Sequence, residues 1–296
     1  MTYSIVARDP ASGRFGIAIQ SRWPFVGAGC PWVESGVGAV ATQSFTEIAH
    51  GPNGLARLRT GEAATAALAA LLAADLGAAV RQVGIVDAAG RAAAHTGERC
   101  VAAAGHATAD GVSVQANMME RPTVWPAMLS AFQDADGDFV DRLLAALRAA
   151  EAEGGDLRGR QSASLVVSGA PCDPAWKLEI DIHVGDHASP IDELERLVRL
   201  HRAYQALDRA EERGAAGDIA GARAASEDAT RLAPGDGQVM VWQAIGMAGG
   251  GLIGPARGLL AAATTMNPRW PEFVRRLAAS GAQPELVEPA RLLLGE

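Results

Sequence analysis

Residues 2–20, TYSIVARDPASGRFGIAIQ, decide the fold of the N-terminal half of the chain. Two runs rich in β-branched residues, 3–8 and 14–20, are separated by a short polar segment. Within that segment Pro10 favours a turn and Gly13 can adopt a positive φ. The pattern predicts a β-hairpin whose first strand begins almost at the start of the chain. Such a strand would hold residue 2 on a rigid support.

The next stretch of the chain alternates between strand and helix patterns. Strands are predicted at 36–43, 81–87, 91–96, 112–117, 161–168 and 176–184, and helices at 52–60, 62–75, 122–135 and 137–153. Closely spaced strands indicate antiparallel sheets. We expect an α+β fold in which a helix pair packs outside each of two stacked sheets, a four-layer αββα sandwich.

From about residue 190 the strand pattern disappears, and Ala, Leu, Arg and Glu dominate the sequence. Small residues and prolines recur at a spacing of 34 residues: Ala222-Arg223 returns as Ala256-Arg257, and Pro234 returns as Pro268. This spacing is typical of tetratricopeptide repeats. The sequence therefore predicts an αββα domain over 1–188 and an all-α, tetratricopeptide-like domain over 189–296, with a plain helical bundle as the alternative.

The composition of the chain argues against nucleic-acid binding, membrane insertion, secretion and a zinc site. The chain has 296 residues, a net charge of −8 and only 5% aromatic residues, so we expect no nucleic-acid partner. It contains no run of about 18 apolar residues and no basic-then-apolar leader, which predicts neither a membrane span nor a secretory signal. Its three cysteines follow no CxxC spacing, which indicates free thiols rather than a zinc site. A cytoplasmic protein is the expectation.

Thr2 places a hydroxyl directly after the initiator methionine. Methionine aminopeptidase removes Met1 when the next residue is small, which would leave an amine and a hydroxyl on one residue. An α-amine has a pKa of about 7.7–8.0, so part of it is neutral at cellular pH. The neutral amine can take the hydroxyl proton and activate the oxygen as a nucleophile. The alternative is that Thr2 is a strand-favouring residue without a chemical role.

Residues 2–10, TYSIVARDP, closely resemble the opening of a prokaryotic family, the domain of unknown function 1028 family of the Ntn (N-terminal nucleophile) hydrolase superfamily. Further matching segments follow in order at 21–22, 36–43, 50–55, 82–87, 115–119 and 155–163. The resemblance covers about residues 2–185 and implies the αββα fold. By superfamily analogy it also implies hydrolysis of an amide or peptide-like bond. We expect no cofactor.

Catalytic roles are predicted for Thr2, Asn117 and Arg22. Proteasome-like members of the superfamily place a lysine near the nucleophile, but the only lysine here is Lys177. Arg22 is the nearest basic substitute. It cannot act as a base, but it could lower the pKa of the amine or hold a substrate carboxylate. The Asn117 amide could donate to an oxyanion or cap a turn.

Five further polar residues are predicted to bind substrate: Ser21, Gln43, Ser44, Arg160 and Gln161. The alternative for Arg160 is a solvated loop side chain. The histidines are scattered, and no glycine-rich stretch follows a strand and opens a helix as a GxGxxG motif would. We therefore assign neither a metal nor a nucleotide.

Two functions from different classes remain. The first is an N-terminal-nucleophile amidohydrolase that cleaves a small amide through an acyl-enzyme on Thr2. The second is a non-catalytic αββα scaffold whose C-terminal helices hold a protein partner. Two repeats are few for an independent solenoid. Packing of these helices on the sandwich, or on a second subunit in a homodimer, fits that count.

Overall fold

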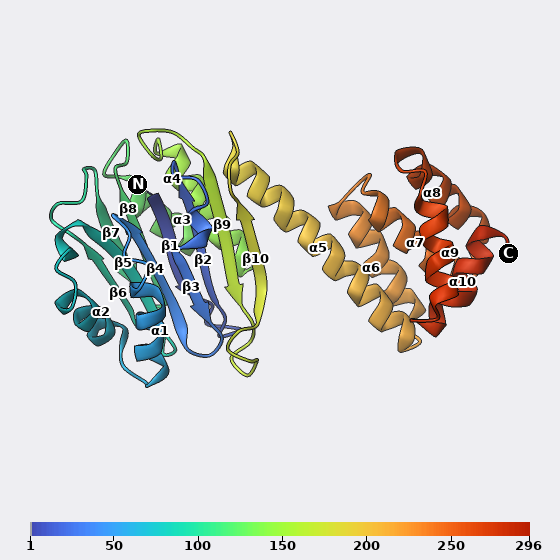
Figure 1. Cartoon of the computed structure of the whole chain (residues 1–296), viewed down its shortest axis with the longest axis horizontal. Helices are drawn as coiled ribbons and strands as arrows, with labels where there is room; N and C mark the ends of the chain where they lie inside the picture. The colour runs from blue at the N-terminus through green and yellow to red at the C-terminus, as the bar shows by residue number, and fades with distance from the viewer. Residues whose placement is uncertain (1) are drawn as a thin grey trace. The chain divides into compact units, whose positions relative to one another are not determined.

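The computed structural model describes residues 2–296 and contains two compact units. The first unit ends at Glu195 and the second runs from Arg196 to Glu296. Two antiparallel sheets and the helices packed on them make up the first unit, and the second is helical (Figure 1). The mixed α+β character and the helical C-terminal region agree with the sequence patterns.

The first sheet has six antiparallel strands in the order β10-β9-β2-β1-β8-β7. They are β1 (Thr2–Arg8), β2 (Phe15–Ser21), β7 (Gly105–Ala109), β8 (Val112–Asn117), β9 (Ser162–Ser168) and β10 (Leu178–Val184). The predicted hairpin is confirmed, because Thr2 pairs with Ser21 and Arg8 pairs with Phe15. The strand predicted from residue 176 begins only at Leu178.

The second sheet has the order β3-β4-β5-β6. Its strands are β3 (Pro31–Glu34), β4 (Gly38–Ser44), β5 (Arg81–Asp87) and β6 (Ala92–Thr96). The sequence patterns missed β3 and β7, which are edge strands. Edge strands are only partly covered, so the apolar alternation that predicts a strand is weak in them. The GHATA segment of β7 contains no large apolar residue.

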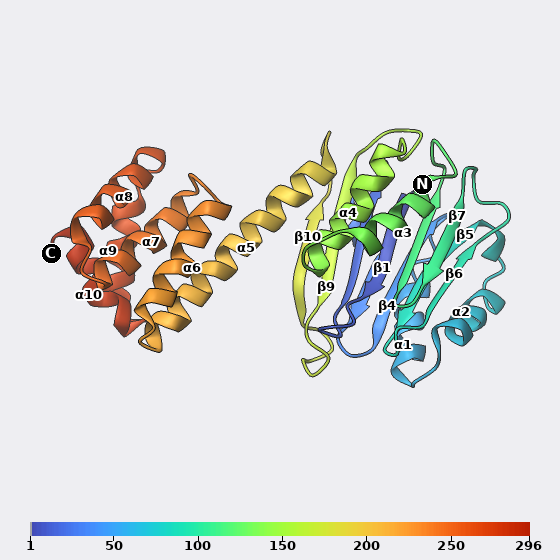
Figure 2. The same cartoon turned by 180° about the vertical axis from the view of Figure 1, so that it is seen from behind.

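Each sheet packs against its own pair of helices (Figure 2). Helices α1 (His50–Arg59) and α2 (Ala64–Ala73) pack on the second sheet, and α3 (Val124–Asp134) and α4 (Phe139–Ala152) pack on the first. Across the two sheets, β1 contacts β4 and β5 contacts β8. An apolar cluster fills one part of this contact and contains Val6, Ile17, Ala41 and Val86.

The helices that follow β10 in the chain are α5 (Pro190–Ala215), α6 (Ile219–Leu232), α7 (Gly237–Gly249), α8 (Ile253–Met266), α9 (Trp270–Ser280) and α10 (Pro284–Leu294). Ala229 and Ala263, which repeat at the predicted spacing, are both fully buried. Pro234 and Pro268 each stand two residues after a helix end. Within residues 2–296, none of the helices has both the length and the apolar character that crossing a membrane requires.

A buried layer of polar side chains joins the two sheets beside the apolar cluster. Ser4 on β1 donates from Oγ to Gln43 Oε1 on β4 at 2.7 Å, and Gln115 Nε2 on β8 donates to Ser4 Oγ at 2.6 Å. Gln43 Nε2 donates to Gln82 Oε1 on β5 at 2.7 Å. All four side chains are fully buried. Because every amide finds partners, the layer avoids the cost of unpaired polar groups.

Gly84 on β5 makes room for this layer. A Cβ at position 84 would stand 2.2 Å from Gln115 Oε1. That oxygen accepts the Ser113 hydroxyl at 2.8 Å, so Gln115 is held at both ends of its amide. A methyl group on residue 84 would therefore displace a side chain that cannot move without losing hydrogen bonds.

We predict that Gly84→Ala lowers the free energy of unfolding by about 1–3 kcal/mol, through overpacking and lost buried hydrogen bonds. Urea unfolding followed by tryptophan fluorescence measures this change. Gly258→Ala in α8 is the matched control, because open space surrounds position 258. The control should be neutral or stabilising by up to about 1 kcal/mol. Equal stability of the two variants would contradict the proposed packing.

Asp75 links α1 to the start of β5. His50 Nε2 at the start of α1 lies 3.0 Å from Asp75 Oδ2, and Arg81 Nε donates to the same oxygen at 2.8 Å. The Gly77 N–H donates to Asp75 Oδ1 at 2.7 Å. The hydrogen bond from Arg81, helped by those from Gly77 and His50, lowers the pKa of Asp75 from 3.8 to about 2.

The lowered pKa sets a pH dependence. The ionised Asp75 carboxylate stabilises the fold above its ordinary pKa of 3.8, and this contribution is lost as the pH falls through about 2. We expect Asp75→Asn to destabilise the protein by about 1–2 kcal/mol at pH 6, with a difference that shrinks below pH 4. Denaturant unfolding of both proteins between pH 6 and pH 3 measures it, and a pH-independent difference would contradict the ionised network.

Candidate functional site

Thr2 lies between the two strands that flank β1. In the sheet register it is opposite Ser21 on β2 and Asn117 on β8. Thr2 Oγ1 donates to Ser21 Oγ at 3.0 Å. The Thr2 carbonyl oxygen accepts from Asn117 Nδ2 at 3.3 Å and from Gln43 Nε2 at 3.2 Å. The structure thus brings four of the predicted site residues together, from three strands of one sheet and one strand of the other.

The two amides hold the main chain of residue 2. Asn117 Nδ2 donates to Gln82 Oε1 at 2.7 Å as well as to the Thr2 carbonyl. Gln43 Nε2 also donates to the Gln115 carbonyl at 3.2 Å. In this geometry both side chains orient Thr2, and an oxyanion role for Asn117 stays a prediction. Sequence analysis did not single out Gln82, because a glutamine inside an apolar strand carries no motif.

The hydroxyl of Thr2 faces a second hydroxyl. Ser21 Oγ also accepts the Trp23 N–H at 3.0 Å, so the turn after β2 orients it. Thr2 is 3% exposed in the full chain. Its α-amine becomes free only when residue 1 is removed, and Met1 lies outside the described residues. Removal of Met1 therefore stays a prediction.

Backbone strain is concentrated at this end of the sheets. Among residues 2–296, the non-glycine residues with positive φ are Ser44 (73°), Met118 (61°) and Phe25 (58°). Ser44 directly follows Gln43, and Met118 directly follows Asn117. Such conformations cost of order 1–3 kcal/mol each and cluster at functional sites. The predicted residue Ser44 thus contributes a strained backbone next to Gln43.

The predicted basic and amide residues of the loops separate into two groups. The Arg22 guanidinium donates to Gln161 Oε1, and Gln161 Nε2 donates to Asp186 Oδ1 at 3.2 Å. Arg160 instead pairs with Glu151 on α4. Glu151 also accepts the Tyr3 hydroxyl, and Tyr3 points to the face of β1 opposite to that of Thr2. Arg22 and Gln161 therefore contact each other beside Ser21, the residue opposite Thr2 in the sheet, whereas Arg160 is tied to α4.

Hydrogen-bonded loops enclose the start of β1. We define the Thr2 rim as residues 22–30, 45–49, 79–81, 97–104, 118–120 and 155–161. On one side Met118 N–H donates to the Val101 carbonyl at 3.0 Å, and Leu157 N–H donates to the Met118 carbonyl at 3.2 Å. Gln161 N–H then donates to the Ser21 carbonyl at 3.1 Å.

The other side of the Thr2 rim is joined in the same way. Phe45 N–H donates to the Val80 carbonyl at 3.4 Å, and Arg99 N–H donates to the Ala79 carbonyl at 2.8 Å. The Cys30 carbonyl accepts the N–H of Thr42 on β4 at 3.0 Å. Hydrogen bonds thus join the rim segments either to one another or to the strands at the end of the sheets where Thr2 lies.

Asp156 is the buried anchor of the Thr2 rim, and sequence analysis did not identify it. Its carboxylate accepts the N–H of Arg22 at 3.2 Å and the N–H of Arg158 at 2.9 Å. The Arg158 guanidinium compensates its charge at 3.0 Å. The available signal was an acidic residue after Gly155 in an arginine-rich loop, a pattern that equally describes a solvated loop.

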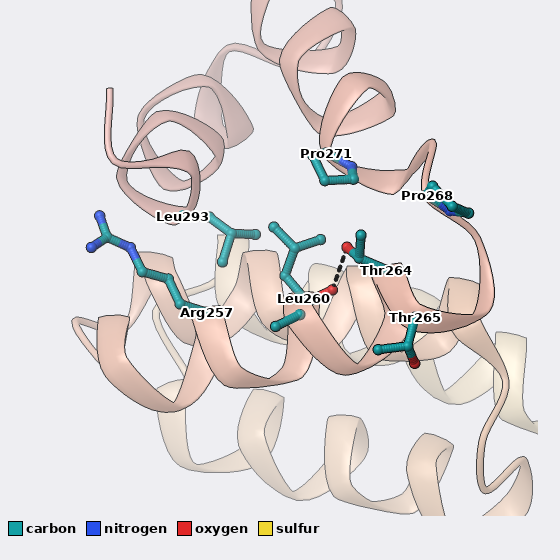
Figure 3. A pocket seen from close by; sticks show the side chains of 8 residues that line it. Arg257, Leu260, Thr264, Thr265, Pro268, Pro271 and Leu293 are labelled. Carbon is teal, nitrogen blue, oxygen red and sulfur yellow. Dashed lines mark hydrogen bonds between the residues drawn. The ribbon is translucent and has the colours of Figure 1, made fainter.

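A separate groove lies in the second unit. Side chains of α8 and the start of α9, together with Leu293 of α10, line a largely apolar hollow of about 470 Å³ (Figure 3). Leu260, Pro271 and Leu293 supply apolar surface, and Arg257 lies at one end of the hollow. The Thr264 hydroxyl is turned back to the Leu260 carbonyl at 2.7 Å.

Comparisons with known proteins identify relatives of the first unit. A family model described as a family of unknown function, DUF1028, matches residues 2–194. A crystal structure of protein SPO2555 from Silicibacter pomeroyi, which carries the same family designation, is 32% identical with a TM-score of 0.61. The alignment covers 67% of this chain and 88% of that chain. A search of curated proteins gave no match.

We predict that Asp156→Ala loosens the Thr2 rim, because two backbone N–H groups lose their shared acceptor and Arg158 loses its partner. Trypsin should then cleave after Arg158 and Arg160 about tenfold faster or more, as the local opening equilibrium shifts. Asp110→Ala, in an exposed turn at the opposite strand end, is the control and should leave the cleavage rate unchanged. Unchanged cleavage of Asp156→Ala would show that the rim does not depend on this carboxylate.

Proposed function

The chain belongs to the DUF1028 family of unknown function, and from this premise we propose that its first unit is an N-terminal-nucleophile amidohydrolase. The observation that carries the proposal is the Thr2 hydroxyl, which lies 3.0 Å from Ser21 Oγ at the first residue of a central strand. The strained backbone of Ser44, Met118 and Phe25 near that strand end supports it. The substrate is a small amide or peptide-like compound.

The proposed reaction uses one residue as nucleophile and base. After removal of Met1, the neutral α-amine of Thr2 takes the proton of Oγ1, directly or through a water molecule. Oγ1 bonds to the amide carbonyl carbon, the C–N bond breaks, and the leaving amine takes the proton. The acyl group is then held on Thr2 as an ester. Water, deprotonated by the same amine, attacks the ester carbonyl. The bond between the acyl carbon and Oγ1 then breaks, Oγ1 takes the proton from the amine, and the acid is released.

The site geometry assigns a role to each neighbour in this reaction. Ser21 orients the hydroxyl of Thr2, while Asn117 and Gln43 hold its carbonyl. The Arg22 guanidinium would lower the pKa of the amine by its positive charge. With a helix pair packed on each of the two sheets, this unit fits the four-layer αββα arrangement of Ntn hydrolases.

The second candidate is a binding module. The apolar groove of Figure 3 favours it, because such a surface suits an apolar peptide segment. In this reading the C-terminal helices are tetratricopeptide-like and hold a protein partner or a second copy of the chain in a cytoplasmic homodimer. The first unit is then a scaffold, and Thr2 has no chemical role.

We predict that a β-lactone probe acylates the wild-type protein on Thr2 and that Thr2→Ala abolishes this labelling. Alanine is also small enough to permit removal of Met1, so the variant differs only in the hydroxyl. Thr2→Ser should retain labelling, because it keeps the nucleophilic oxygen. Intact-protein mass spectrometry with peptide mapping measures the added mass and its position.

Thr108→Ala provides the control for this experiment. Thr108 is an exposed threonine on β7, and its loss should leave the labelling intact. Equal labelling of Thr2→Ala and wild type, or full activity in protein that retains Met1, would refute the enzyme. Persistence of partner binding in Thr2→Ala, with no labelling of the wild type, would favour the scaffold.

A further inference from the structure

Large apolar side chains are exposed around the Thr2 rim. Six of them have exposed fractions between 42% and 68%: Trp23, Phe25, Phe45, Ile48, Val101 and Leu157. In the first unit, the other exposed large apolar side chains are Leu76 and Trp176, which are more exposed than these six. Trp176 precedes β10 at the opposite strand end. Exposed apolar side chains are thus more numerous at the end of the sheets where Thr2 lies, a distribution that favours a recognition surface there.

These side chains are presented by an ordered backbone. The Trp23 N–H is bound by Ser21 Oγ, and the Trp23 carbonyl accepts the Ser162 hydroxyl at 2.6 Å. The Phe25 N–H donates to the Gly185 carbonyl at 2.9 Å, and Phe25 has a left-handed φ of 58°. A strained conformation that turns a phenylalanine ring outward indicates a constraint other than burial.

Arg22 supplies a positive charge at the same place. Within residues 2–296, no carboxylate lies within 4 Å of its guanidinium, and its partner is the neutral Gln161 amide oxygen. The backbone N–H of Arg22 is fixed by Asp156 at 3.2 Å. The arginines of segment 155–161 differ from Arg22 in this respect, because Arg158 is paired with Asp156 and Arg160 is paired with Glu151. The residue next to Ser21 therefore offers an uncompensated planar cation, which suits bidentate binding of a carboxylate.

We infer that the Thr2 rim recognises an N-acyl amino acid, an amide with an apolar acyl group and a free carboxylate on its amine side. The inference rests on the proposed function and names its substrate class. Arg22 binds the carboxylate, and the exposed side chains of Trp23, Phe25 and Leu157 contact the acyl group. The amide bond between these two ends is then directed toward Thr2. Its hydrolysis consumes water and yields a carboxylic acid and an amino acid.

The overall charge of the chain bears on how an anionic ligand would bind. The chain as a whole carries a net charge of −8, so a binding site for an anion requires a local cation such as Arg22. At 0.1 M ionic strength, salt screens the repulsion between the negatively charged protein and an anionic ligand beyond about 10 Å, so a cation in direct contact with the ligand matters most.

The test measures binding in full-length Thr2→Ala, which cannot form an acyl-enzyme. The probe is N-(phenylacetyl)glycine, compared by calorimetry with its carboxamide, which lacks only the charge, and with N-acetylglycine, which lacks the aromatic acyl group. We expect both analogues to bind at least about tenfold more weakly, as lost ion pairing and lost apolar contact predict. In the Thr2→Ala background, Arg22→Gln should remove the preference for the carboxylate over the carboxamide.

Arg223→Gln, an exposed arginine of α6, is the matched control and should keep both preferences in the same background. Thermal unfolding checks that each variant is folded. Equal binding of acid and carboxamide to folded protein overturns the inference, as does failure of the probe to bind. Labelling of Thr2 by the β-lactone in the same preparation would then leave the proposed function standing. Sedimentation that shows a dimer dispersed by Leu157→Ser also overturns the inference, because the apolar rim is then an interface between copies.

Discussion

The pairing of β1 with β2 and β8 from its first residue is the constraint on which the rest of the structure depends. This register places Thr2 opposite Ser21 and Asn117 and directs its side chain toward the second sheet. A slip of one residue would exchange the faces of Thr2 and Tyr3. Tyr3 prevents that slip, because its ring is fully buried and its hydroxyl donates to Glu151 on α4. Burial raises the pKa of the Tyr3 hydroxyl well above its ordinary value, so it stays a donor.

The polar layer between the sheets converts this register into a rigid site. Gln43 and Gln82 come from the second sheet, and Asn117 and Gln115 come from the first. Buried amides are costly when unpaired, but a fully paired network specifies one arrangement more strictly than apolar packing does. Because Gln43 and Asn117 both donate to the Thr2 carbonyl, the relative position of the two sheets decides where the candidate nucleophile lies.

At the Thr2 rim several ordinary rules of folding are broken together. Met118 and Phe25 adopt left-handed backbone angles, as does Ser44 directly before the segment 45–49. Aromatic rings face solvent, and among the described residues the Arg22 guanidinium is paired with an amide rather than with a carboxylate. Proteins tolerate such departures where function requires them and offset their cost elsewhere. Here the offset comes from the buried Asp156, which orders the loop that carries Arg158, and from the backbone hydrogen bonds of the rim segments. The coincidence of these departures at one strand end, rather than any one of them, locates the candidate site.

The sequence by itself determined the strands and helices that a repeating pattern of apolar residues along the chain can predict. Alternation predicted the β1–β2 hairpin and most strands, and the loss of alternation after about residue 190 predicted the C-terminal helices. Thr2, Ser21, Asn117 and Gln43 were predicted as site residues from their places at or near strand ends, and the resemblance to a family directed attention to residue 2. Only the tertiary structure decided which of these residues meet. It showed the edge strands β3 and β7, the bridging role of Gln82 and the anchoring role of Asp156, and it separated Arg160 from the Thr2 side of the sheet. The physical reason is that hydrogen bonds between two sheets and between loops join residues far apart in the chain, and periodicity along the sequence carries no information about such pairs.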